Sequence, residues 1–573
     1  MENLKKLETL KDILTNRCEV YKDRVAFLEK DKITRKFKEI KYIQIKEDAF
    51  AFGTALLKDL KLKDKKVAVI GENSYKWYLT YMSVTCGIGV IVPFDKELPA
   101  NEVENLMKCS EADCIVYSTR QKEKIESIMP NLSKNVIYIE MDKSQNDDIS
   151  YSFDELLKNG YEYIEKGDTN YIDSEIVPEK FCSLIFTSGT TANPKGVMLC
   201  HKNLVTNIYA CEVAMPPMKD LRYFSILPMH HTYEFMINYL NTTAKGCSVA
   251  IGEGLKYFLK DIQETKPHVL VVVPLIVERF NRQIEKSIKR QGKENKIDRV
   301  SKFANAMSII GIDIRRSIFK QIIDNFGGRL KYIFCGGAPL SADLVKKMQS
   351  YGFVFVQGYG LTEAAPLVCT ALPNDQAPGT VGKPIPNTEV RIDLDEGQVE
   401  GEIIVKGPNV MLGYYKDEEE TNKTLKKGWL YTGDIGHFDQ KGHLVISGRS
   451  KNVIVTKNGK KIFPEELEFL VNQTPLVNES MVYGKVDEND KTEVILAVRV
   501  TLDEEYIQDT YGAQRPNDEE IYNMIWNDIK KINASLVSYK SIKILEIKDD
   551  DFIKTTTLKI KRNEELESGK IKK

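Results

Sequence analysis

A string of small and hydroxylated residues that ends in a lysine occupies residues 184–197. An apolar run leads into Thr187, Ser188, Gly189, Thr190 and Thr191, and Lys195 follows within a Pro-Lys-Gly triplet. Small residues let backbone N–H groups converge on one point, and hydroxyls and an ammonium group add donors that suit phosphate. A Walker A loop is excluded, because the order G-x-x-x-x-G-K-[ST] is absent. We therefore expect an anion-binding loop, with an ordinary Ser/Thr-rich surface loop as the alternative.

Other reactive side chains follow apolar runs further along the chain. His230 and His231 come after residues 224–227, and such a pair is more often hydrogen-bonded structure than chemistry when it stands alone. Gly336 and Gly337 follow a predicted strand, where two glycines let a flat ligand approach the backbone.

The elements that must position these residues follow from hydrophobic periodicity. Strands are predicted at residues 66–71, 90–93, 114–117 and 136–139, and helices at 47–60, 74–86 and 202–215. This alternation indicates parallel α/β layers. Leu4, Leu7, Leu10, Ile13 and Leu14 recur at helical spacing and predict an amphipathic first helix. Residues 378–415 contain Gly/Pro turns between short alternating strands, which predicts a β-rich subdomain.

The composition limits the classes of protein to which this chain can belong. The 573 residues, with 42% apolar and 29% charged residues, predict an ordinary globular chain with more than one domain. A net charge of −1 gives no case for nucleic-acid binding. The ten cysteines form no C-x-x-C pair, which argues against a disulfide framework or zinc site and fits a reducing cytosol. The charged start lacks a signal core and the longest apolar run, 269–277, is too short to span a bilayer. We expect a cytoplasmic protein, with surface contact to a membrane as an alternative.

Taken together, these segments resemble the adenylate-forming superfamily, which comprises acyl-CoA synthetases, peptide-synthetase adenylation domains and firefly luciferases. The phosphate-binding loop is followed in order by L-P-x-x-H at 227–231, Y-G-L-T-E at 359–363, W-L-Y-T-G-D at 429–434 and G-R-S-K at 448–451. The last segment, 553–562, is similar to the family's P-K-T-x-x-G-K-I. This chain departs from the family pattern at Ala192, where Gly is usual, and at Ile553 and Leu558, which replace Pro and Gly.

The resemblance implies an α/β fold in two parts. A large N-terminal AMP-binding domain of layered α/β sheets with a β-rich subdomain is expected over residues 1–448. A hinge is expected at 449–451, with Lys451 at its turning point, and a small mobile C-terminal α/β lid domain over 452–573. The family runs its two half-reactions with two orientations of this lid.

The resemblance also assigns roles to residues. Tyr359 is expected to stack on adenine, Thr362 to bind the α-phosphate, and Asp434 and Arg449 to contact the ribose. Glu363 is expected to hold Mg²⁺ with Thr187, and Lys559 to bridge the acid carboxylate and the α-phosphate, with Lys554 and Lys561 as competitors. Catalytic roles fall on Lys559, His231, Thr187 and Glu363. The remaining implied ATP/AMP-binding residues are Ser188, Gly189, Thr190, Thr191, Lys195, Gly336, Gly337, Ala338, Gly358 and Gly360.

The implied activity is ATP-dependent conversion of a long-chain fatty acid to acyl-AMP and then to acyl-CoA. His231 is expected near the acid carboxylate, Phe235 at an aromatic gate to the acyl tunnel, and Gly337 along the acyl substrate. Gly459 is expected to line the path of CoA. Three alternatives are an acyl–acyl-carrier-protein ligase, an adenylating enzyme with another acceptor, and a non-catalytic nucleotide- or lipid-binding relic of the fold. The basic insert, residues 278–331, has fourteen Lys and Arg against six Asp and Glu. It suits a solvated helical face, an anionic membrane or an acidic carrier.

Overall fold

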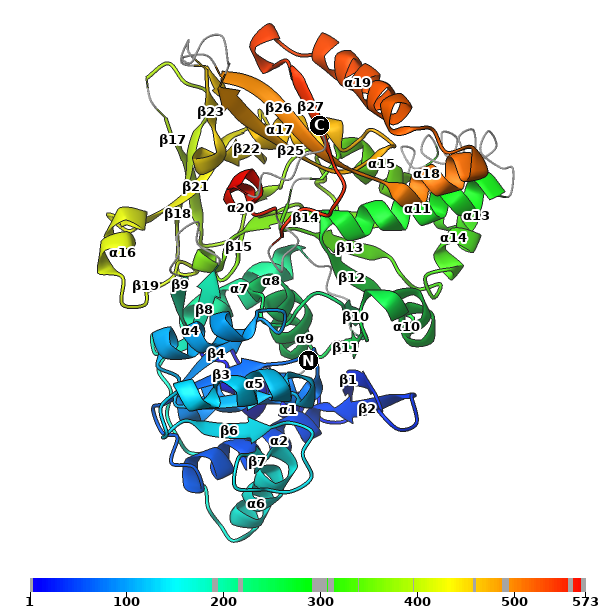
Figure 1. The fold of residues 1–573 in the computed structure, drawn as a ribbon. Coiled ribbons are helices and arrows are strands. Elements are labelled where there is room, and N and C mark those ends of the chain that lie inside the picture. Colours follow the sequence, from blue (N-terminus) through cyan, green and yellow to red (C-terminus); the bar gives the residue numbers. More distant parts are fainter. Residues whose placement is uncertain are drawn as a thin grey trace. The chain divides into compact units, whose positions relative to one another are not determined.

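The computed structural model describes residues 4–187, 194–214, 220–290, 307, 314–338, 340–394, 396–456, 460–486, 494–554 and 560–567. The chain divides into two compact units (Figure 1). The first unit comprises Met1–Ala338, Ala342–Val390 and Val405–Leu430. The second unit comprises Pro339–Ser341, Arg391–Ile404 and Tyr431–Lys573.

The first unit contains a nine-stranded sheet with the order β16-β15-β14-β13-β12-β10-β11-β1-β2. Neighbouring strands from β14 to β1 are parallel, and β2, β15 and β16 are antiparallel to their neighbours. The bounds are β1 Val25–Lys30, β2 Phe37–Lys41, β10 Arg222–Ser225, β11 Ser248–Ile251, β12 Val269–Val272, β13 Tyr332–Cys335, β14 Val354–Gly360, β15 Leu367–Thr370 and β16 Lys383–Pro384.

An eight-stranded sheet of the same unit has the order β19-β9-β8-β4-β3-β5-β6-β7. Strands β8, β4, β3, β5, β6 and β7 are parallel, and β9 and β19 continue the sheet in antiparallel fashion. The predicted parallel strands are therefore confirmed. The bounds are β3 Lys66–Ile70, β4 Val90–Phe94, β5 Cys114–Tyr117, β6 Ile137–Glu140, β7 Tyr151–Ser152, β8 Phe181–Thr187, β9 Lys195–Cys200 and β19 Gly413–Tyr414.

Helices cover these sheets, and an aromatic cluster joins them. Helix α3 follows β3 of one sheet and begins at Ser74, whose side chain accepts a hydrogen bond from Trp77 N. The ring of Tyr78 on α3 lies 4.8 Å from that of Phe27 on β1 of the other sheet. The main bounds are α2 Tyr42–Lys58, α3 Tyr75–Ser83, α4 Ala100–Ser110, α5 Lys122–Ile128, α6 Phe153–Glu165, α7 His201–Ala214, α8 Thr232–Glu234, the π-helix η5 Phe235–Leu240, α9 Asn241–Lys245, α10 Phe258–Thr265, α11 Pro274–Arg290, α13 Arg315–Ile318, α14 Lys320–Asp324, α15 Ala342–Ser350, the 3₁₀ helix η7 Thr362–Ala364 and α16 Glu418–Thr424.

The predicted first helix is wrong in extent. Leu7 and Leu10 are buried as expected, but they precede the helical stretch, which contains η1 (Ile13–Arg17) and α1 (Cys18–Val20). Their backbone N–H groups donate to side chains of α7 instead, Leu7 to Tyr209 Oη and Leu10 to His201 Nδ1. The apolar spacing therefore predicted the burial of Leu7 and Leu10 correctly. It predicted the helix wrongly, because the N–H groups of these residues bond to side chains instead of to helical carbonyl groups.

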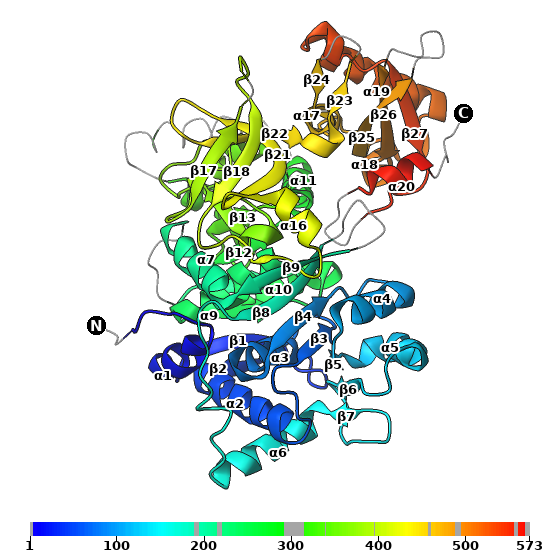
Figure 2. The same ribbon diagram turned by 90° about the vertical axis from the view of Figure 1, so that its left-hand side faces the viewer.

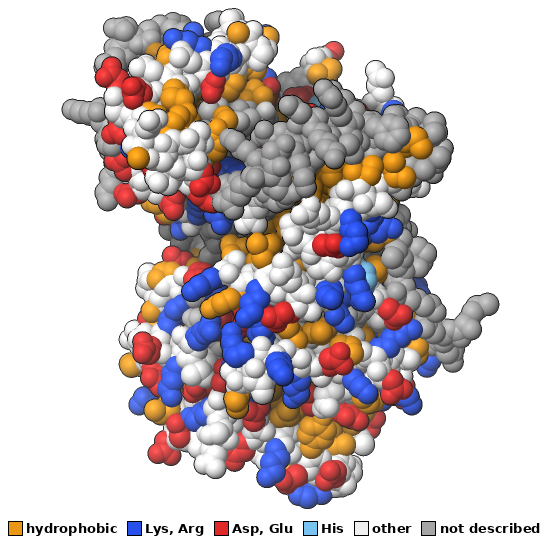
Figure 3. Space-filling view, turned by 90° about the vertical axis from the view of Figure 1, so that its right-hand side faces the viewer, with side chains coloured by type: hydrophobic (Ala, Val, Ile, Leu, Met, Phe, Trp, Pro, Cys, Tyr) orange, Lys and Arg blue, Asp and Glu red, His pale blue; other side chains and the backbone are white. Residues whose placement is uncertain are grey.

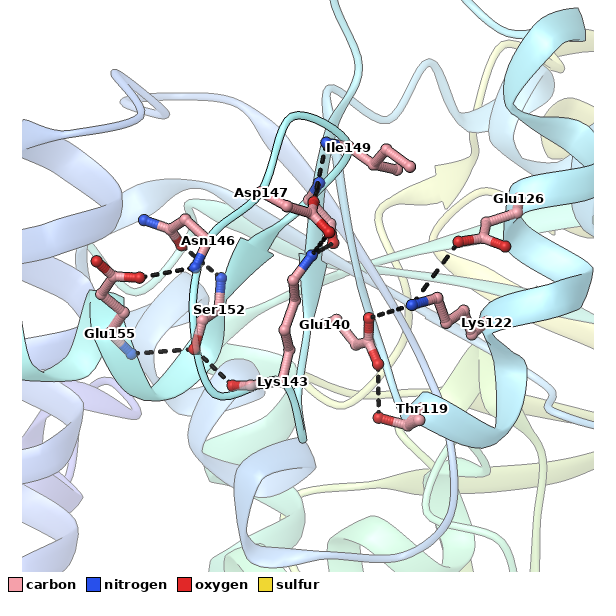
Figure 4. A network of polar contacts seen from close by, with 11 residues as sticks. Thr119, Lys122, Glu126, Glu140, Lys143, Asn146, Asp147, Ile149, Ser152 and Glu155 are labelled. Atoms are coloured by element: carbon pink, nitrogen blue, oxygen red, sulfur yellow. Dashed lines mark hydrogen bonds and ion pairs between the residues drawn. The ribbon is translucent and has the colours of Figure 1, made fainter.

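The polar segment between β6 and α6 is ordered by its own hydrogen bonds (Figure 4). Asp147 accepts from the backbone N–H groups of Ile149 and Ser150 and pairs with Lys143. These donors lower the pKa of Asp147. Ser152 caps α6 by accepting from Glu155 N at 3.2 Å. Polar side chains of this segment therefore bond to nearby backbone groups, where they close turns and cap a helix.

The second unit includes part of a five-stranded sheet and a separate small α/β body. The sheet has the order β17-β18-β21-β20, with β22 beside β21. Figure 2 shows α17, α19 and α20 next to the sheet formed by β25, β26 and β27. The bounds are β17 Glu389–Asp393, β18 Gly401–Lys406, β20 Leu425–Lys426, β21 Trp429–Phe438, β22 Leu444–Arg449, β23 Ile454–Val455, β24 Lys461–Ile462, α17 Pro464–Val471, β25 Val477–Val486, β26 Val494–Leu502, α18 Glu504–Tyr511, α19 Asp518–Ala534, β27 Ile544–Lys548 and α20 Arg562–Glu567.

The surface carries charges of both signs. On the face drawn in Figure 3, lysine and arginine side chains are interspersed with acidic side chains, as the net charge of −1 leads one to expect. Within the described residues, none of the helices combines the length and the apolar character needed to cross a bilayer.

Candidate active site

Loops with predicted site residues follow parallel strands at one edge of the nine-stranded sheet. Strands β10, β12, β13 and β14 run in the same direction, with Val272 opposite Cys335 and Cys335 opposite Gln357. The carboxyl ends of parallel strands share an edge, which is where α/β sheets bind ligands. The loops with His231 and Gly336 therefore begin along one line with the end of β14, where Tyr359 lies.

The glycine turn after β13 lies against the end of β14. A Cβ atom at Gly336 would lie 3.3 Å from the carbonyl oxygen of Gly358 and 3.4 Å from Cζ of Tyr233. Gly337 has φ of +86°, which disfavours other residues, and Gly337 and Ala338 are exposed. The backbone at Gly337 and Ala338 is therefore accessible to the flat ligand that the two glycines predict. The side chain of Tyr359, by contrast, is buried.

Glu363 stands in η7, a turn that several side chains fix. Its backbone oxygen accepts from Met411 N at 2.8 Å, and its Oε1 accepts from Tyr414 Oη at 2.9 Å. Asn207 Nδ2 and Asn409 Nδ2 both donate to the carbonyl oxygen of the next residue, Ala364. Elements far apart in sequence therefore hold the predicted metal-binding carboxylate in one place.

The two ends of the predicted phosphate loop meet across β8 and β9. Thr187 is opposite Lys195 in this antiparallel pair, and Thr187 Oγ1 lies 3.5 Å from the Lys195 carbonyl oxygen. Ser188, Gly189, Thr190 and Thr191 lie outside the described residues. Lys195 Nζ pairs with Glu420 and lies 5.2 Å from the ring centroid of Tyr414. Lys195 and Glu363 thus both contact Tyr414.

The two histidines lie on a loop that the other sheet holds. His230 Nε2 is 3.2 Å from Asp95 Oδ2, directly after β4, and the rings of His230 and His231 are 4.1 Å apart. Asn73, after β3, donates to the Leu227 carbonyl oxygen at 2.7 Å and accepts from Met229 N at 3.0 Å. The sequence indicated neither Asn73 nor Asp95. Their position in the loops after the buried parallel strands β3 and β4 was the signal that could have found them.

An apolar pocket begins beside these histidines. It is lined by Tyr81, Pro93, Ile185, Leu204, Met229, His230, Thr232, Phe235, Met236, Leu240 and Ala365, and its cavity volume is about 10 Å³. That volume holds about one water molecule. The ring of Phe235 lines this cavity and packs against two other rings. It lies 4.1 Å from the ring of Tyr81 and 5.4 Å from that of Trp77. An acyl chain can enter only if side chains such as Phe235 move.

A buried carboxyl group belongs to Glu234, which directly precedes the lining residue Phe235 in the chain. Glu234 Oε1 accepts from Ser225 Oγ at 2.5 Å and from Asn238 Nδ2 at 2.9 Å. Burial raises the pKa of Glu234 to about 8, against the opposing effect of these two donors. No described residue donates to or accepts from its Oε2. Burial therefore favours the protonated form of Glu234 at neutral pH.

The predicted ribose-binding pair comes together in the second unit. Asp434 on β21 is opposite Arg449 on β22, and Arg449 Nε lies 3.0 Å from Asp434 Oδ1. Asp434 is buried while Arg449 is exposed. Lys451, the predicted hinge residue, is exposed in the short helix Ser450–Asn452.

Lys559 and Gly459 lie outside the described residues, but the neighbours of Lys559 can be compared. Lys554 pairs with Glu479, and Lys561 Nζ lies 3.0 Å from Glu564. Both competitors for the catalytic role therefore have carboxylate partners within their own unit. Arg562, which follows, donates to both carboxylate oxygens of Glu468 on α17.

Comparison with known proteins identifies the class. A model of the AMP-binding enzyme family matches residues 14–415, and a model of the AMP-binding enzyme C-terminal domain matches residues 451–568. The chain belongs to the AMP-binding enzyme family and is an adenylate-forming ligase.

Within that family, the chain is similar to long-chain acyl-CoA synthetases. It is 27% identical over 571 residues to long chain acyl-CoA synthetase 1 of Arabidopsis thaliana, covering 91% of this chain and 85% of the relative. It is 28% identical over 491 residues to long-chain-fatty-acid–CoA ligase 1 of Homo sapiens, covering 78% and 68%. The fold matches that of o-succinylbenzoate coenzyme A synthetase from Bacillus subtilis in complex with ATP and magnesium ion. The TM-score is 0.72 at 20% identity, with 97% of this chain and 99% of that one covered.

Proposed function

We propose that this protein is an ATP-dependent long-chain fatty acid–CoA ligase. A carboxylate oxygen of the acid attacks the α-phosphorus of ATP, and the bond to pyrophosphate breaks. The CoA thiol, after losing its proton, then attacks the carbonyl carbon of acyl-AMP, and AMP leaves. The observation that carries the proposal is the match of both AMP-binding family models, and the small apolar pocket around Phe235 and His230 is where an acyl chain would enter. The similarity to long-chain synthetases supports the choice of acid.

The residues share the work of positioning and charge neutralisation. Lys195 and the loop 187–195 bind the β- and γ-phosphates, Tyr359 and the 336–338 turn bind adenine, and Asp434 with Arg449 binds the ribose. The hydroxyl of Thr187 and the carboxylate of Glu363 are both oxygen donors, a set that fits Mg²⁺, which neutralises phosphate charge when bound. Lys559 bridges the carboxylate and the α-phosphate, and His231 lies beside the carboxylate.

Rotation of the C-terminal part of the chain accounts for the change from adenylation to thioester formation. We assign the hinge to residues 449–451 and the lid to 452–573. One orientation of the lid presents Lys559 for adenylation, and the other presents the Gly459 segment to CoA. Support comes from the separate family match at residues 451–568.

A panel of acids tests the substrate. Pyrophosphate release is measured with Mg-ATP and straight-chain acids of increasing length, from acetate to stearate, and with benzoate. Activity should rise toward the long chains, because each buried methylene adds roughly 1–3 kcal/mol of discrimination. A maximum at acetate or at benzoate would refute the long-chain assignment while leaving adenylation intact.

The acceptor is tested in the same reaction. Adding CoA should convert acyl-AMP to acyl-CoA, whereas an acyl carrier protein should remain unmodified. The carrier alternative rests on the basic insert, yet two of its cations are already used within the fold. Arg315 donates to the Gln349 carbonyl oxygen at 3.2 Å and Arg316 to that of Leu330 at 2.8 Å. Acylation of the carrier without acyl-CoA formation would reverse the assignment.

A further inference from the structure

The short strand β19 brings Tyr414 beside the phosphate-loop lysine. Tyr414 is opposite Val197 in the β19–β9 pair, and Tyr415 N donates to the Gly196 carbonyl oxygen at 2.7 Å. Lys195 begins β9, so its side chain and that of Tyr414 are neighbours across two strands. This contact joins segments that the sequence separates by more than two hundred residues.

Lys195 has a carboxylate partner. Its ammonium group pairs with Glu420 on α16, and the two side chains are only 18% and 27% exposed. The phosphates of ATP require the same ammonium group as a point charge. A carboxylate therefore occupies the position on Lys195 that a phosphate oxygen would take.

Helix α16 holds Glu420 in this place. The side chain of Asp417 caps the helix by accepting from Glu420 N at 2.9 Å. Thr421 Oγ1 accepts from Tyr414 N at 2.8 Å, which ties the helix to β19. A Cβ atom at Gly413, where φ is +145°, would lie 2.9 Å from Thr421 Cγ2. The close packing of this turn holds the Glu420 carboxylate against the ammonium group of Lys195.

Tyr414 connects this ion pair to the predicted metal-binding carboxylate. Its ring lies 5.2 Å from Lys195 Nζ, a cation–π distance, and its hydroxyl donates to Glu363 Oε1 at 2.9 Å. One buried side chain therefore orients both the phosphate-binding cation and the carboxylate.

We propose that Glu420 is an internal competitor of ATP for Lys195, and that Tyr414 positions Glu363 for the metal ion. The proposal rests on the phosphate-binding role of Lys195 in the proposed function. When ATP binds, a phosphate oxygen replaces Glu420 as the partner of Lys195, and the displaced carboxylate turns toward solvent. Displacement is favoured over sharing, because a carboxylate beside a triphosphate places like charges together. The pair thereby neutralises Lys195 until nucleotide arrives.

The affinity for ATP tests the role of Glu420 without any acyl substrate. Binding of ATP to the full-length protein is measured by titration calorimetry, for the wild type and for Glu420→Gln. Removing a partly buried ion-pair partner and its repulsion of phosphate should lower the dissociation constant about two- to fivefold. An unchanged or raised constant for Glu420→Gln would overturn the proposal, since Glu420 would then be a support of Lys195 or irrelevant to it.

Glu419→Gln is the matched control, because it removes the same charge from the same helix. Glu419 is 82% exposed and pairs with Lys423 rather than with Lys195. Its variant should bind ATP as the wild type does, and an equal gain in both variants would mean a general charge effect and overturn the proposal. Lys195→Met should weaken ATP binding. If it does not, the proposed function of the loop fails, whereas weakening by Lys195→Met without a gain in Glu420→Gln refutes only this inference.

Tyr414→Phe tests the second half of the proposal. The ring stays beside Lys195 and only the hydroxyl bond to Glu363 is lost. Mg²⁺ should improve ATP affinity about fivefold less in this variant than in the wild type, and affinity without Mg²⁺ should be unchanged. A merely structural role would lower both affinities equally, and that result would contradict the positioning role.

Discussion

Glu234 shows how one residue couples the fold to pH. Its carboxyl group is buried, and Ser225 and Asn238 donate to one of its oxygens. Ser225 also accepts from Asn73 Nδ2 and Tyr239 Oη, at 3.0 and 2.7 Å. Through Ser225 and Asn73, the buried carboxyl group is linked to the loop that leads to the histidines.

Glu234→Gln should remove a pH dependence of stability. The pKa of Glu234 is about 8 in the folded chain, compared with the ordinary glutamate value of 4.5. Between these values the unfolded state has lost the proton that the folded state retains, so stability falls as pH rises, by up to about 1.4 kcal/mol per pH unit. Below pH 4.5 both states are protonated, and above pH 8 the effect is constant. The melting temperature of the variant, relative to the wild type, should therefore rise from pH 5 to pH 8. Parallel melting curves over that range would contradict this account.

The site residues that the sequence predicted are those that stand in short local motifs, wherever their partners lie. Thr187, Lys195 and Glu363 stand in short strings whose order carries the signal. The sequence carries no such signal for contacts between distant segments. Lys195 and Glu420 are 225 positions apart, and Met229 and Asn73 are 156 positions apart. Tyr414 lies 51 residues from Glu363. Only the pairing of strands and the packing of the two sheets brings these residues together.

At the scale of elements, the turn from β14 to η7 places Glu363. A Cβ atom at Gly360 would lie 2.1 Å from the carbonyl oxygen of Pro366, a backbone atom that cannot turn aside. The Leu361 N–H donates to that same oxygen at 2.9 Å. The close return of the chain after β14 therefore requires glycine at this position.

Gly360→Ala should destabilise the first unit and disturb the Glu363 turn. Overpacking of this kind typically costs about 1–3 kcal/mol. Gly358→Ala is the matched control on the same strand, because its Cβ atom would meet Leu367 and Cys369 only at 3.4 and 3.6 Å. Thermal unfolding should show a clear loss for Gly360→Ala and little change for Gly358→Ala. Equal melting temperatures for the two variants would refute the steric argument.

Most elements were predictable because their apolar patterns are periodic. Helix α7 and the parallel strands β3 to β6 were predicted within a few residues, since burial on one or both faces imposes the period. The first segment was not, because the N–H groups of Leu7 and Leu10 bond to side chains rather than to a helical turn. The packing of α16 on β19 had no periodic signal at all, because the strand has two residues.

At the scale of the whole molecule, the proposed roles are divided between the two units. The first unit contains Lys195, Glu363 and the apolar pocket, and the second contains Asp434, Arg449 and Lys559. In the proposed function, a lid that carries Lys559 separates adenylation from thioester formation. The two half-reactions should therefore respond differently to substitutions in the second unit.

Lys559→Ala should abolish adenylation and largely spare the attack of CoA on pre-formed acyl-AMP. Lys561→Ala is the matched control, because Lys561 lies two positions away and pairs with Glu564. Pyrophosphate release and acyl-CoA formation are measured separately for each variant. Equal loss of both half-reactions in Lys559→Ala, or the same selective loss in Lys561→Ala, would remove Lys559 from its assigned role.

The central claim is that the acid becomes an acyl adenylate, and oxygen labelling tests it most directly. Palmitate labelled with ¹⁸O in both carboxylate oxygens is incubated with the protein, Mg-ATP and CoA, and the products are analysed by mass spectrometry. Attack of the carboxylate on the α-phosphorus predicts one ¹⁸O atom in AMP and one in palmitoyl-CoA. Unlabelled AMP, or label in pyrophosphate or inorganic phosphate, would contradict the proposed function.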